Sequence, residues 1–222
     1  EKSLMRGLLN RDDLPCVRKM VGETAAKLLA DAQGDIELVN DYCRMVPVQL
    51  VQDYFGLDGI DREYLIRWSY WNQYDAFNNQ PFDMLTDSEH REIVARHDQA
   101  SKELVAYIAV LMLRKLVRVK LAAPFHFVFD PIRGLLHRLF GMAPPERRDV
   151  MVTRMLRSKF ARQADFPLTR VGVNAGGLLI GAIETTSQAV AQTVEYFIAH
   201  PALLKKAKEA ARQPDSKMFD AM

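Results

Sequence analysis

The sequence predicts a mainly α-helical fold, organised as a single partial domain over residues 1–222. Apolar residues recur at helical spacing along most of the chain. Runs of alternating β-branched residues, which would favour strands, are nearly absent. A length of 222 residues lies at the upper end of what one domain usually contains. Together these observations favour one helical unit, or a large part of one.

The first half of the chain is expected to form three helical segments, which cover 12–34, 35–56 and 61–80. Each is bounded by residues that start or stop helices. A proline inside the second segment lacks an N–H and should kink or divide that helix. The residues that mark these boundaries are Asp12 or Asp13 as N-cap, Pro15 in the first turn, Gly34 as a stop and Pro47 as the interruption.

The sequence "TDSE" at 86–89 fits a capping box and predicts the start of a helix that reaches roughly Lys120. The basic residues near the end of this helix are expected on a solvated side. Four prolines within 121–148 predict a loop with one short helix, and helix is expected to resume over 145–159. The basic residues are Arg114, Lys115, Arg118 and Lys120.

One uninterrupted helical pattern runs from about Leu168 to His200 and ends before Pro201. At about 1.5 Å per residue this helix is roughly 50 Å long, enough to cross a whole domain. A shorter amphipathic helix over 202–213 follows it.

Composition narrows the function classes. The 30 Lys and Arg residues nearly balance the 28 Asp and Glu residues, so no strong field for nucleic acid is expected. Cys16 and Cys43 lack C-x-x-C spacing and are interpreted as reduced structural thiols of a cytoplasmic protein, with one disulfide as the alternative. The apolar run over 104–113 is about half of what a membrane span needs, and the first ten residues lack the apolar core of a signal peptide. We therefore expect no transmembrane segment.

The long helix contains an unusual stretch, "GGLLIGAIETTSQAV" at 176–190. Each glycine inside a helix costs on the order of 0.5 to 1 kcal/mol relative to alanine. Glycines at 176, 177 and 181, with Ala182, predict a patch of helix with almost no side chains. Glu184 and Thr185 follow within one turn, so an acid and a hydroxyl border that patch. A threonine that bonds back to the carbonyl four residues earlier can loosen the helix enough to hold water.

Within this stretch, "G-A-I-E-T-T" resembles the oxygen-activation motif of the cytochrome P-450 family, usually written [A/G]-G-x-[D/E]-T-[T/S]. Two further segments are similar to that family: "HPALLKKAKE" after the long helix, and 35–59 with its central Pro47. The resemblance implies that Gly181 and Ala182 lie against a haem (heme, iron protoporphyrin). It also implies that Glu184 and Thr185 are the acid and the alcohol that deliver protons during oxygen activation. Ala182 stands where the family usually has glycine.

The same resemblance implies a haem-thiolate monooxygenase, which inserts one atom of O2 into an apolar small molecule. Its electrons would come from a ferredoxin or a flavoprotein partner. The axial cysteine of the family lies in an F-x-x-G-x-x-x-C loop, and neither Cys16 nor Cys43 has that context. The sequence also begins without Met and ends partway into a helical pattern, so we expect a fragment that binds little haem alone. The complete enzyme would supply the axial ligand.

Other interpretations remain open. The aromatic cluster that includes Trp68, Trp71 and Phe77 favours core packing, although the resemblance places it over a substrate pocket. His90 and His97 share a helix face without a third ligand, which favours a solvated face over a metal site. The apolar, basic stretch over 104–140 could contact a membrane surface or pack against other parts of the fold. The alternative to an enzyme is a non-enzymatic, all-helical binding module whose central helix packs tightly on a partner.

Overall fold

The computed structural model describes residues 11–140, 150–157 and 167–212, with side chains for all of these except 122–140. Most of these residues are helical, and no strand occurs among them. The predicted mainly α fold is therefore confirmed for this part of the chain.

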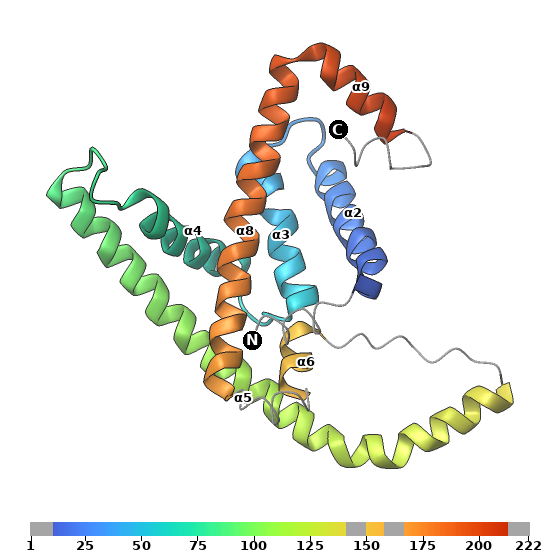
Figure 1. The fold of residues 1–222 in the computed structure, drawn as a ribbon. Helices are drawn as coiled ribbons and strands as arrows, with labels where there is room; N and C mark the ends of the chain where they lie inside the picture. Colours follow the sequence, from blue (N-terminus) through green and yellow to red (C-terminus); the bar gives the residue numbers. More distant parts are fainter. Residues whose placement is uncertain (1–10, 141–149, 158–166, 213–222) are drawn as a thin grey trace.

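The long helix α8, Leu168–Ala199, runs unbroken through the middle of the structure (Figure 1). It begins at the predicted residue and ends one residue before the predicted end. Its buried apolar residues recur every four positions and face the helices that pack around it. This stripe consists of Val171, Ala175, Leu179 and Ile183. Helix α8 is thus the element around which the core is built.

The first described helices are η1, Arg11–Asp13, and α2, Leu14–Asp31, with Pro15 in the first turn of α2 as predicted. Asp13 is in the N-cap position, but its side chain makes no cap hydrogen bond. Its carboxylate instead accepts a hydrogen bond of 3.0 Å from the Tyr54 hydroxyl and one from the Arg154 guanidinium. The start of α2 is therefore held by distant parts of the chain.

The segment around Pro47 is divided, as expected. A π-helix, η2 (Leu38–Cys43), precedes α3 (Met45–Leu50), and a second π-helix, η3 (Val51–Phe55), follows it. Pro47 has no N–H to donate to the carbonyl of Cys43, four residues earlier. The Ser187 hydroxyl of α8 donates to that carbonyl at 2.9 Å. The turn after η3 contains Gly56 at a φ of 84°, a conformation that favours glycine.

Helices α4, Arg62–Asn78, and α5, Asp87–Phe140, lie next to α8 (Figure 1). The capping box at the start of α5 is confirmed. The Thr86 N–H donates to Glu89 Oε2 at 2.7 Å, and the Glu89 N–H donates to Thr86 Oγ1 at 3.4 Å.

The prediction of a loop over the first part of 121–148 is wrong, because α5 continues through Pro124 and Pro131 to Phe140. A proline removes only its own N–H, and a bend relieves the clash of its ring with the preceding turn. Figure 1 shows that the last third of α5 is curved. The helix therefore accommodates both prolines instead of ending.

The expectation that Lys115 lies on a solvated side is also wrong. Lys115 is 5% exposed, and its Nζ lies 2.9 Å from Asp58 Oδ2. The Arg114 guanidinium binds the same carboxylate and the Asp58 carbonyl. Burying a lysine is costly unless it is paired, and the loop after η3 provides this pairing.

Two short helices complete the described structure: α6, Met151–Arg157, and α9, Pro201–Ala211. Helix α6 falls inside the predicted segment 145–159, and α9 begins one residue before the predicted segment 202–213. Met151, Val152 and Met155 of α6 are buried in the core between α5, α8 and η3.

Candidate functional site

The glycines of α8 divide into two groups with different surroundings. A Cβ atom at Gly172 or Gly176 would lie 3.2 Å from the side chain of Ile108 on α5. These two glycines therefore serve the close packing of α8 against α5. A Cβ atom at Gly177 or Gly181 would meet no other described atom within 4 Å. The second pair therefore has open space where a side chain would stand.

The open face of α8 continues from the second pair of glycines to Thr185. Gly177, Gly181 and Thr185 are exposed and follow one another at intervals of four residues. The Thr185 hydroxyl donates to the Gly181 carbonyl, as expected, and α8 nevertheless remains α-helical there. Ala182, the other predicted haem contact, is half-buried and packs against the core. The flat part of this face is therefore centred on Gly181.

Glu184, in contrast to Thr185, is buried, with 2% of its surface exposed. Its Oε2 accepts hydrogen bonds from Arg44 Nη2 at 2.9 Å and from Arg44 Nε at 3.2 Å. Its Oε1 has no hydrogen-bond partner among the described residues. Sequence analysis missed Arg44, because no local pattern connects it with a residue 140 positions further along the chain.

Glu184 and Thr185 meet at a small cavity of about 300 Å³ between α4 and α8. Tyr70 and Phe77 of α4 lie on the opposite wall. Burial raises the pKa of the Tyr70 hydroxyl, and the neighbouring Tyr74 and Glu184 add to this, against an opposing effect of Arg44. The structure thus brings the predicted acid and alcohol to one hollow. The complete lining comprises Tyr70, Gln73, Tyr74, Phe77, Asn78, Glu184, Thr185 and Gln188.

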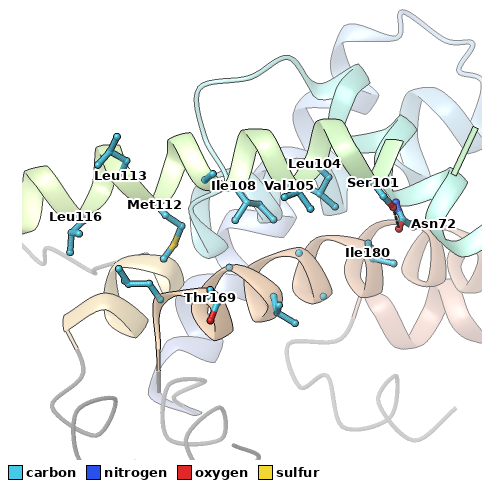
Figure 2. A pocket seen from close by; sticks show the side chains of 16 residues that line it. Asn72, Ser101, Leu104, Val105, Ile108, Met112, Leu113, Leu116, Thr169 and Ile180 are labelled. Carbon is cyan, nitrogen blue, oxygen red and sulfur yellow. Dashed lines mark hydrogen bonds between the residues drawn. The ribbon is translucent and has the colours of Figure 1, made fainter. Parts of the chain in front are cut away.

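A second, larger hollow of about 670 Å³ runs between α5 and the first half of α8. Figure 2 shows apolar side chains from both helices along it, with Ser101 and Asn72 at one end and Leu116 at the other. Gly177 lines this groove. Gly181 lies one turn beyond Gly177 and one turn before Thr185, and it lines neither hollow.

The three aromatic residues predicted near a substrate have different positions. Trp68 is a core residue, 2% exposed, and its Nε1 donates to Glu103 Oε2 at 2.8 Å. This bond is the main reason that the pKa of Glu103 is below its usual value. Trp71 is half-buried and lines neither hollow. Phe77 is largely exposed and lines the small cavity.

The open face of α8 fits the distal side of a flat cofactor such as haem, because Gly181 leaves room and Thr185 offers a hydroxyl beside it. The cysteines do not fit an axial thiolate. Cys43 is 2% exposed, and burial raises the pKa of its thiol. Cys16 is half-buried in α2. The described residues therefore leave space for a flat group at Gly181 and offer no axial thiolate.

No cluster of three or more metal-binding side chains occurs within 11–121, 150–157 and 167–212. His90 lies beside Asn79, and His97 lies 3.3 Å from the Ser101 hydroxyl. None of the helices in the described ranges is both long and apolar enough to span a membrane.

Comparisons of the chain with models of protein families, with curated proteins and with solved structures give no match.

Proposed function

We propose that this chain is the distal part of a haem-dependent monooxygenase of the cytochrome P-450 type. The complete enzyme inserts one oxygen atom from O2 into an apolar organic substrate, with electrons from a ferredoxin or a flavoprotein. One observation carries the proposal: Gly181 is flat and open, with an apolar groove one turn away on one side and the Glu184–Thr185 cavity one turn away on the other. A molecule over Gly181 would adjoin an apolar compartment and a source of protons.

In this proposal Gly181 and Ala182 contact the face of the haem. Haem held by a thiolate supplies the activation of O2 and the cleavage of the O–O bond. The axial thiolate must come from outside these 222 residues, since Cys43 is buried and Cys16 is part of α2. The chain's own contribution is the shape of the distal face and the delivery of protons.

Proton delivery would depend on the pair of side chains at the small cavity. The Thr185 hydroxyl, which donates to the Gly181 carbonyl here, can rotate to donate to a reacting atom, since a hydroxyl is both donor and acceptor. Glu184 Oε1 is buried without a partner in the described chain, so it is the carboxylate oxygen left to carry and release a proton. Arg44 binds Oε2 and fixes the carboxylate, so it acts as a positioning residue.

The test uses the coding sequence that extends this chain to an F-x-x-G-x-x-x-C loop. The reduced protein with carbon monoxide is expected to show the Soret band typical of thiolate ligation. Gly181→Leu should reduce haem uptake at least tenfold, because its side chain fills the flat face. Gly22→Leu, at an equally open helical position in α2, should leave uptake unchanged. A missing thiolate band, or normal uptake by the Gly181 variant, refutes the proposal.

A second test shows whether Glu184 transfers protons or only supports the structure. Removing a general acid or base lowers rates by about 10² to 10⁴. Glu184→Gln is expected to slow product formation at least a hundredfold, with haem uptake retained. The 222-residue chain alone should bind little haem. A stoichiometric thiolate-type spectrum from this chain would contradict the proposal that the axial thiolate lies outside it.

The exposed apolar side of α5 favours a second candidate, a non-enzymatic helical binding module. Val105, Val110 and Leu113 are each at least 63% exposed, which is typical of a surface that contacts another molecule. A gene that ends without a thiolate loop would favour this module over the enzyme.

A further inference from the structure

The groove between α5 and α8 has the dimensions and the surface of a site for an elongated molecule. Its volume of about 670 Å³ falls within the range of small-molecule sites. Along α5 it extends from Ser101 to Leu116, which is about 22 Å of helix. The two helices run in opposite directions along it, so that Leu116 lies near Thr169 and Ser101 lies near Ile180 (Figure 2).

The lining determines what the groove can hold. None of the sixteen described residues that line it carries a charge, and most are aliphatic. Burying a carboxylate or an ammonium group without a partner is strongly unfavourable. An occupant of the groove should therefore be uncharged along its whole length. Val105, Leu113 and Val173 line it and are more than 60% exposed, so an apolar occupant would cover surface that now contacts water.

One end of the groove is polar. The Ser101 hydroxyl donates to Asn72 Oδ1 at 2.9 Å, and Asn72 Nδ2 donates to the Trp68 carbonyl at 2.8 Å (Figure 2). A carboxamide has two N–H donors and a hydroxyl has two acceptor sites. These bonds use one Asn72 donor and the Ser101 proton. A second Asn72 N–H remains to donate to a ligand oxygen, and the Ser101 oxygen, which lies 3.3 Å from His97 Nε2, keeps one acceptor site for a ligand hydroxyl.

We propose that this groove binds an elongated, uncharged molecule with a single hydrogen-bonding oxygen, such as a long-chain primary alcohol or ketone. The oxygen lies at Asn72 and Ser101, and the hydrocarbon chain extends along Ile108 and Met112 toward Leu116. Binding to the groove is independent of haem. If the proposed function holds, this molecule is also the substrate, because Gly177 of the groove is one turn from Gly181.

The experiment uses the 222-residue chain without haem. Nile red, an uncharged fluorescent dye, is bound first and is then displaced by tetradecanol, tetradecanoate or tetradecylammonium. Tetradecanol is expected to displace the dye at a ratio of one per chain, at least tenfold more tightly than either charged analogue. Equal displacement by the charged analogues would overturn the proposal.

Three variants locate the site. Gly177→Leu should weaken tetradecanol binding at least tenfold, because its side chain enters open space in the groove. Gly22→Leu is the matched control, since this equally open glycine of α2 lies outside the groove lining and its substitution should leave tetradecanol binding unchanged. Asn72→Leu should weaken the alcohol about three- to tenfold, which is the effect of one hydrogen bond, and leave a tetradecane competitor unaffected.

Unchanged alcohol binding in the Gly177 variant would place the molecule elsewhere and refute the proposal. Light scattering gives a second outcome that would refute the proposal. If the chain forms a dimer that the Gly177 substitution dissociates and tetradecanol does not, the groove holds a second copy of the chain. Alcohol binding without haem uptake by the extended chain would keep this inference and refute the monooxygenase. Haem uptake with no alcohol binding would keep the monooxygenase and refute this inference.

Discussion

Replacing Arg44 with methionine tests whether a single partner holds the buried acid of α8. The Glu184 side chain is 3% exposed and the Arg44 side chain is 19% exposed. Two hydrogen bonds, of 2.9 and 3.2 Å, join them. Arg44→Met removes both bonds and leaves a buried carboxylate without a charged partner. This substitution is therefore expected to be much more harmful than the loss of a surface ion pair.

The expected loss of stability follows from this burial. Removing one partner of a buried ion pair costs about 3 to 5 kcal/mol, and the partial exposure of Arg44 favours the lower value. At about 2 to 4 °C per kcal/mol for a chain of this size, the midpoint of thermal unfolding should fall by roughly 6 to 12 °C. Glu184→Gln should cost only about 1 to 2 kcal/mol, because Arg44 keeps its 2.6 Å bond to Asn40 Oδ1 and its position over the Tyr70 ring.

The assay is urea unfolding followed by tryptophan fluorescence, which reports on the core through Trp68. The double variant Arg44→Met with Glu184→Gln should cost about 2 kcal/mol less than the sum of the single variants. Lys19→Met is the control, since its 3.8 Å pair with Glu23 is exposed and should contribute under about 1 kcal/mol. A cost below about 1 kcal/mol for Arg44→Met, or additive single effects, would refute the reasoning.

Three further predictions concern stability. Burial and the Asp58 charge raise the pKa of Tyr107. The contribution of Tyr107 to stability is therefore complete below pH 10 and is lost as pH rises further. Tyr107→Phe should reduce this alkaline loss of stability in urea unfolding measured from pH 9 upward. Gly176→Leu should destabilise by about 1 to 3 kcal/mol in thermal unfolding, because its side chain would overlap Ile108, and unchanged stability would contradict the packing described. Thr86→Ala should cost about 1 kcal/mol by the same measurement through loss of the capping box, and amide exchange should increase only in the first turn of α5.

The positions of the helices could be predicted from the sequence to a large extent, because helix signals are local. The capping box at 86–89 and the start of α8 at Leu168 depend on residues a few positions apart, and both are confirmed. The end of α5 could not be predicted in this way. Proline ends many helices. Whether α5 bends or stops at Pro124 depends on what surrounds that residue.

Trp68 and Lys115 show a second limit. An aromatic residue at helical spacing fits equally well in a core and in a ligand site, and a lysine after a run of apolar residues is usually solvated. The Trp68 indole is buried because Glu103 accepts its N–H, and Lys115 is buried because Asp58 lies within 2.9 Å. Both partners come from other elements of the fold.

The mainly helical fold and the extent of α8 can be read from the amino-acid sequence, because both depend on neighbours in the chain. The packing of Gly176 on Ile108, the open space at Gly181 and the contact of Glu184 with Arg44 are visible only in the folded chain. Every face of a helix has the same backbone. What lies against each face is decided by helices that are distant in the sequence.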